Sequence, residues 1–188
     1  FKNSLGVSDK WFADVFDPKS IEADSIYNIN LDVQIDDLKD AGIKAKLAYL
    51  NSCLTGSFHL DNYIAGYSPF SKNENIAAIA NSVGVLQDLW PTEMMGLLKD
   101  GYRVGNWLKH IAYLETHILG DPTFHFASDK AKELNEATVL NQSASYWKKV
   151  LNENNADLQS LALNKLTNIL PEKEVSPILK DYYFNSAF

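Results

Sequence analysis

Cys53 is the residue with the most chemistry to offer, and it is the only cysteine in the 188-residue chain. The apolar run 47–50 precedes it and predicts a short buried strand, while small, turn-compatible residues fill positions 51–58. This places the thiol at the carboxyl end of a parallel strand, where open α/β sheets carry their reactive groups. The alternative is an inert, small hydrophobic side chain, because thiol reactivity depends on exposure and a neighbouring cation.

A cysteine nucleophile needs a base, and every histidine follows Cys53 in the sequence: His59, His110, His117 and His125. His59 is a candidate base because it is close to Cys53 in sequence, but it lies on the outgoing loop, whereas the base is expected to face the thiol from the neighbouring strand. The other three are expected to be solvated or satisfied in the core. The histidines lack the spacing of a helical His-x-x-x-His or a Cys/His cluster, so we expect no metal ligands. The Gly-x-x-x-x-Gly-Lys pattern of phosphate-binding loops does not occur either.

The composition narrows the class of partner. A net charge of -7 without a basic tract argues against nucleic acid as a partner. No apolar run approaches the length of a membrane span. The single cysteine excludes an internal disulfide and leaves the redox compartment open. An apolar content of 46% is enough for a substantial core.

The elements that position Cys53 follow from apolar patterning. The strand over 46–51 is followed by a second strand over 76–83, which lacks alternation and is therefore expected to be covered on both faces. Apolar residues at helical spacing predict one long helix over 92–114, and a turn at 120–123 indicates the last strand of a domain. Shorter elements are expected as helices over 9–16 and 32–41 and as strand segments over 116–119 and 124–126.

The sequence changes character at Ser128. Helical segments are predicted over 143–151, 157–170 and 174–184, and Pro171 separates the last two. They resemble a unit of a helical repeat. Their apolar stripe is most simply a packing face, although it could also bind a protein partner: Leu158, Leu161, Ala162, Leu166 and Ile169. We therefore expect an α/β domain over 1–127 and a helical appendage over 128–188.

Three segments, Asn51–Phe58, Ile76–Val83 and Leu119–Thr123, occur in an order that resembles the C-terminal half of gingipain-type cysteine peptidases. These are caspase-like α/β proteins, and the resemblance covers roughly residues 43–126. It implies a caspase-like sheet with flanking helices, Cys53 as the nucleophile, a peptide or protein substrate and no cofactor. By analogy it also implies secretion or a place in the cell envelope.

The resemblance also implies that the loop after the second strand lines the pocket for the substrate side chain. The candidates are Asn81, Ser82 and Trp90, and the alternative for Trp90 is ordinary core filling. Asp121 and Pro122 match a segment that is structural in the family.

The family's general base is a histidine, usually in a His-Gly pair, on a strand before the cysteine strand, and no histidine precedes Cys53 here. We therefore expect the chain to be a fragment of a cysteine endopeptidase that works through an acyl-enzyme. The fragment alone is expected to be inactive. The alternative is a catalytically inactive caspase-like domain with a helical scaffold for protein–protein interaction. A metal hydrolase ranks third.

Overall fold

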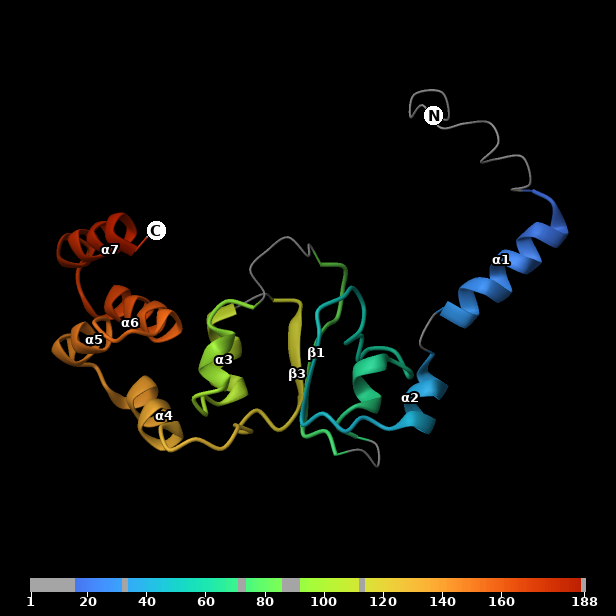
Figure 1. Cartoon of the computed structure of the whole chain (residues 1–188), viewed down its shortest axis with the longest axis horizontal. Helices are drawn as coiled ribbons and strands as arrows, with labels where there is room; N and C mark the ends of the chain where they lie inside the picture. The colour runs from blue at the N-terminus through green and yellow to red at the C-terminus, as the bar shows by residue number, and fades with distance from the viewer. Residues whose placement is uncertain (1–15, 32–33, 71–73, 86–91, 112–113, 187–188) are drawn as a thin grey trace, which may run out of the picture. The chain divides into compact units, whose positions relative to one another are not determined.

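The computed structural model describes residues 16–31, 34–70, 74–85, 92–111 and 114–186 (Figure 1). It divides the chain into two compact units, residues 1–43 and 44–188. The domain boundary expected at residue 127 stays a prediction, and described residues on both sides of it share one hydrophobic core. None of the helices in the described ranges is long and apolar enough to cross a membrane.

The first unit contains two helices, α1 (Pro18–Leu31) and α2 (Ile35–Ala41), and neither buries a residue. The second confirms the helix expected over 32–41. It begins after Gln34, whose backbone N–H donates to the Asp37 carboxylate at 2.7 Å, and it ends at Gly42. The helix expected over 9–16 lies outside the described residues.

The second unit is mixed α/β, built on a small three-stranded mixed sheet with the order β1-β2-β3. Its strands are β1 (Leu47–Leu50), β2 (Ala77–Asn81) and β3 (Thr116–Gly120). β1 and β2 are parallel, as expected, and β3 is antiparallel to β2. β2 is fully buried, as its lack of alternation predicts, because it lies between two strands and is covered on both faces. β1 is half-buried rather than buried, since β2 is its only neighbour among the described strands.

Side chains of β2 alternate between two hydrophobic clusters. Ile79 belongs to the larger cluster, on the face where α3 (Val104–Ile111) lies beside the sheet (Figure 1). There the Trp107 ring packs edge-on against Tyr49 of β1, with ring centroids 5.7 Å apart. Ala78 and Ala80 face the other way and pack with Ala65 of η3 (Ile64–Tyr67), a short 3-10 helix. These small side chains let the chain approach the sheet closely.

The single long helix predicted over 92–114 is wrong. The chain forms a short 3-10 helix, η4 (Met95–Leu98), then a turn, and only then α3. Gly101 separates the two pieces with a φ of 81°, a left-handed conformation that costs glycine little. The strand expected over 124–126 is also wrong, because the backbone N–H groups of Val104 and Gly105 bind the 122–124 segment instead, at 3.0 and 2.8 Å.

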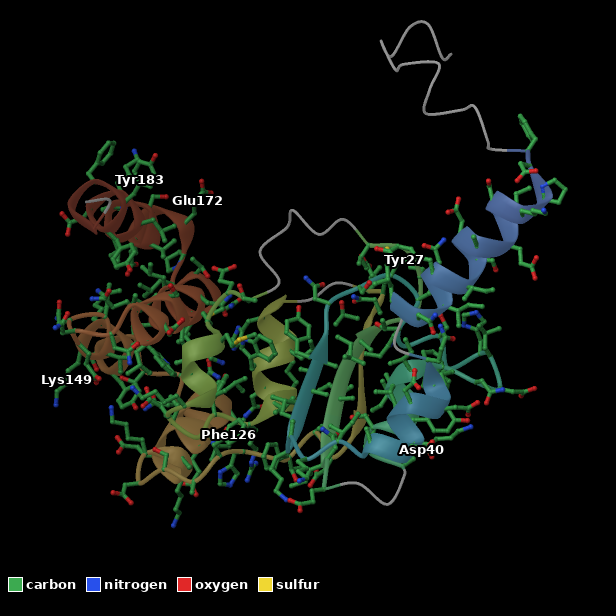
Figure 2. The ribbon with its side chains drawn as sticks, turned by 45° about the vertical axis from the view of Figure 1, so that its right-hand side comes forward. Tyr27, Asp40, Phe126, Lys149, Glu172 and Tyr183 are labelled. Carbon is green, nitrogen blue, oxygen red and sulfur yellow. The ribbon has the colours of Figure 1, made fainter. Side chains whose placement is uncertain are left out.

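Four helices complete the second unit: α4 (Ala131–Leu140), α5 (Ala144–Val150), α6 (Ala156–Ile169) and α7 (Glu172–Ser186). The last three confirm the segments predicted after Ser128, and α4 was not expected. Side chains of Ser143 and Asn155 cap α5 and α6 by accepting backbone N–H groups. The predicted apolar stripe on α6 is a packing face, because it joins the core that contains Trp107. Figure 2 shows the polar side chains of these helices, with Lys149 of α5 extending outward.

The Asn135 side chain connects α4 to the start of α3 by hydrogen bonds. Its Oδ1 accepts from the Arg103 backbone N–H at 2.9 Å and from Asn106 Nδ2 at 3.1 Å. Its Nδ2 donates to the carbonyl oxygens of Gly101 at 2.9 Å and Ala131 at 2.6 Å. The side chain is 5% exposed, and all of its hydrogen-bonding capacity in the amide plane is used.

Candidate functional site

Cys53 lies three residues after the end of β1, near the strand end where the sequence predicts it, and it is exposed. The turn that carries it is held by Thr55, whose hydroxyl lies 3.0 Å from the carbonyl oxygens of both Leu50 and Ser52. Leu54 has a φ of 62°, which is unusual for a residue with a side chain. The thiol therefore lies at the carboxyl end of a parallel strand, on a sharply turned backbone.

The thiol contacts the chain that leaves β2. Its Sγ accepts from the Val85 backbone N–H at 3.3 Å and lies 3.7 Å from the Val85 carbonyl oxygen. Beside it, the Leu54 N–H donates to the Val83 carbonyl oxygen at 3.2 Å. The backbone N–H of Cys53 itself has no acceptor among the described residues. Within the described ranges, one backbone donor therefore remains open next to the thiol.

Small residues after Cys53 let this loop lie against β2. The Gly56 N–H donates to the Asn81 carbonyl oxygen at 2.8 Å. A Cβ at position 56 would lie 2.9 Å from both the Cβ and the carbonyl carbon of Ala80, so only glycine fits without a shift. Ser57 then donates its hydroxyl to the Ser82 carbonyl oxygen at 3.1 Å. The Gly and Ser residues that signal a turn in the sequence thus also set a close approach between loop and strand.

Asn81 joins the ends of all three strands and is 2% exposed. Its Nδ2 donates to the Ser52 carbonyl oxygen at 3.3 Å, and its Oδ1 accepts from the Thr116 hydroxyl at 2.7 Å. Both ends of the amide are therefore engaged by the protein. Ser82, the next residue, is half-buried, and Trp90 lies outside the described residues. The substrate-contacting roles of these three residues stay predictions.

His117 is a member of this neighbourhood that the sequence analysis left among the ordinary histidines. It lies on β3 opposite Ala80, and its Nε2 is 2.9 Å from the Ser82 hydroxyl. The Phe58 ring packs edge-on against the imidazole, with centroids 4.9 Å apart. Strand register brings these residues together across 35 positions of sequence, and no local pattern could have signalled that contact.

The other histidines lie in different surroundings. His59 is next to the Phe58 ring at 6.4 Å between centroids, and His125 Nδ1 is 3.0 Å from the Phe126 carbonyl oxygen. In the helical part, the Nε2 of His110 lies 3.0 Å from the Tyr102 hydroxyl oxygen. No imidazole among the described residues hydrogen-bonds to the Sγ of Cys53.

Titratable groups with a shifted pKa lie in the helical part and at the turn after β3. Burial, with help from the positive charges of Lys165 and Lys109, lowers the pKa of His110 below its usual value. Burial also raises the pKa of Tyr102 to about 12. At the 120–123 turn, two hydrogen bonds from Thr123 lower the pKa of Asp121 and fix the turn.

Within the described ranges, no group of three or more His, Cys, Asp or Glu side chains is arranged to hold a metal ion. No family model, curated protein or solved structure matches the chain. The gingipain-type resemblance and the activity that it implies therefore stay predictions.

Proposed function

We propose that this chain carries the nucleophile of a cysteine endopeptidase, with Cys53 attacking the peptide carbonyl. The observation that carries the proposal is the placement of Cys53, whose exposed thiol lies three residues after the end of a strand paired in parallel with β2. Two further features support it. The thiol is positioned by the Val85 backbone, and the Cys53 N–H is free of any acceptor in the described part of the chain.

The chemistry follows from these groups. The thiolate of Cys53 forms a bond to the carbonyl carbon, and the resulting oxyanion accepts from nearby backbone N–H groups. The Cys53 N–H is one such donor. Collapse of the intermediate breaks the C–N bond, the amine leaves with a proton, and water then hydrolyses the acyl-enzyme. No cofactor is needed for either step.

The mechanism also needs a general base beside the Cys53 Sγ, and none of the described histidines hydrogen-bonds to that atom. The family resemblance assigns it to a histidine on a strand before the cysteine strand, and the sequence contains no histidine before Cys53. An imidazole there would favour the thiolate and later protonate the leaving amine. The caspase-like arrangement of the sheet belongs to the same proposal, and the parallel β1–β2 pair is consistent with it.

The test uses the protein at its full natural length and a peptidyl acyloxymethyl ketone, which alkylates activated cysteine nucleophiles. We expect the probe to label Cys53, as located by peptide mass mapping, and Cys53→Ala to remove the label. Ser52→Ala is the matched control and should keep it. If iodoacetamide modifies Cys53 while the peptidyl probe does not, the thiol is accessible but not catalytic, and the proposal fails.

The second candidate is a catalytically inactive caspase-like domain that acts with its helices as a scaffold for a protein partner. The absence of an imidazole at Sγ among the described residues favours it. Under this proposal Cys53→Ala leaves the biological activity intact, whereas substitutions on the helices remove it. A cell-based complementation assay with the two kinds of variant separates the candidates.

A further inference from the structure

Two adjoining hollows lie on the surface formed by α4, α5 and the start of α6, and we call them together the α4–α5 groove. The smaller hollow is about 150 Å³, and four buried apolar side chains contribute to its lining: Leu134, Trp147, Val150 and Leu158. The larger is about 430 Å³ and extends past Asn141. Glu133 and Tyr146 line both hollows, so the two form a continuous surface.

The groove is acidic. Its lining contains four carboxylates and two ammonium groups, those of Asp129, Glu133, Glu136, Glu153, Lys130 and Lys132. None of these six side chains forms an ion pair with another described residue. Glu133, Glu153 and Lys130 border the smaller, apolar hollow, so its rim carries a net negative charge. A negative rim around an apolar floor suits a ligand that is itself apolar along its length and positive at its end.

Tyr146 lines the smaller hollow together with Glu133 and Glu153 and is held in place. Its backbone N–H donates to the Ser143 hydroxyl at the N-terminus of α5, and its ring packs edge-on against Trp147 at 5.1 Å. Burial raises the pKa of its phenol, and the negative charges of Glu133 and Glu153 raise it further. The phenol oxygen has no hydrogen-bond partner among the described residues. Both carboxylates therefore act on one aromatic group that remains available to a ligand.

We propose that the α4–α5 groove binds a peptide segment of a partner protein by taking in one of its lysine side chains. The four methylene groups lie over the floor made by Leu134, Val150 and Leu158. The ammonium group then lies between Glu133 and Glu153, near the Tyr146 ring, where carboxylates and an aromatic face both favour a cation. Acidic segments are rejected by the same charges. This inference does not depend on any chemistry at Cys53.

The test measures binding of a fluorescein-labelled Gly-Leu-Lys-Gly-Leu-Gly amide by fluorescence anisotropy at low salt, with the Cys53→Ala chain so that cleavage cannot consume the probe. A peptide with norleucine in place of lysine keeps the stem and removes the charge. We expect the lysine peptide to bind about tenfold more tightly than the norleucine peptide. Glu133→Gln with Glu153→Gln should weaken the lysine peptide about tenfold and leave the norleucine peptide nearly unchanged.

The matched control is Glu172→Gln with Glu174→Gln, which removes the same charge from the exposed start of α7 (Figure 2). It should change binding by less than about twofold. Equal affinity for the two peptides, equal weakening by the two double variants, or no binding at about 1 mM peptide overturns the proposal. Self-association that Glu133→Gln with Glu153→Gln abolishes would assign the groove to a second copy of the chain and overturn it as well. Because all proteins in the test lack the thiol, none of these results bears on the proposed peptidase activity.

Discussion

The sheet end that carries Cys53 and the α4–α5 groove treat their polar groups in opposite ways. At the sheet end, Thr55, Asn81 and Ser82 each hydrogen-bond to neighbouring strands or loops, so these three side chains find their partners within the protein. In the groove, Glu133 and Glu153 lie beside an apolar floor without an ion-pair partner among the described residues. The first region is organised to hold one backbone geometry, and the second leaves charge available to something outside the chain.

The comparison assumes that the two regions belong to one cooperative unit, and Trp107→Ala is the strongest way to break it. The Trp107 ring is fully buried in the core shared by the sheet and the helices, and its Nε1–H donates to the Glu93 carbonyl oxygen at 2.8 Å. We expect the free energy of unfolding to fall by about 3–5 kcal/mol. Urea denaturation followed by circular dichroism should show one transition moved to lower urea. Two separate transitions in the unsubstituted protein would mean that the regions fold independently.

Gly56→Ala tests the sheet end, where the loop after Cys53 lies against β2. The added Cβ would lie 2.9 Å from the Cβ and from the backbone carbonyl carbon of Ala80. The loop after Cys53 must therefore move away from β2. We expect a loss of about 1–3 kcal/mol in the free energy of unfolding and faster alkylation of Cys53. Gly84→Ala is the control, because its Cβ would meet nothing within 4 Å, and it should change stability by less than about 0.5 kcal/mol. Equal effects at the two positions would contradict the close loop–strand approach.

The pH dependence of stability probes the helical side. His110 has a lowered pKa in the folded protein, so the unfolded chain binds its proton more readily. The stabilisation from the neutral imidazole is therefore present above the ordinary pKa of 6.5 and is lost as pH falls toward the lowered folded value. Urea midpoints measured at descending pH should fall less steeply in His110→Gln. An unchanged slope in His110→Gln would count against burial as the cause of the lowered pKa.

The smallest expected effect sharpens the description of the groove. Glu133→Gln removes one of the two carboxylates that disfavour the Tyr146 phenolate, so the pKa of Tyr146 should fall. Burial, the larger cause, remains, and the pKa should stay above its usual value. Titration of the Tyr146 ring carbon by NMR measures the change. Glu172→Gln is the control and should leave the Tyr146 titration unaltered. If the pKa of Tyr146 is the same in Glu133→Gln as in the unsubstituted protein, the Glu133 charge does not act on the phenol.

Local patterns predicted the parts of the fold whose causes are local. The apolar run before Cys53 and the unalternating run at 76–83 gave both parallel strands, and helix periodicity gave α5, α6 and α7. Periodicity failed at 92–114, because Gly101 adopts a left-handed φ that ends one helix before α3 begins. It also missed α4, where the buried positions include Asn135 and Thr138 and two large apolar side chains are exposed. The apolar pattern there does not mark the buried face.

The site divides in the same manner. The place of Cys53 at a strand end follows from the residues next to it and was predictable. The contact between Ser82 and His117 depends on the register Ala80↔His117 between antiparallel strands, which the sequence does not encode locally. The α4–α5 groove was also out of reach, because its carboxylates come from α4, the turn before it and the segment after α5. How these parts pack depends on the core beneath them.

Asn135 has a consequence for the chemical ageing of the protein. Deamidation would replace its Nδ2 donor with a carboxylate oxygen directed at the carbonyl oxygens of Gly101 and Ala131. Three acceptors would then face one another without a proton between them, and α4 would be pushed from the start of α3. The helix itself opposes this reaction, because the Glu136 backbone nitrogen is held in helical geometry and cannot easily reach the side-chain carbonyl. Damage at Asn135 is therefore expected to follow loss of the fold rather than to precede it.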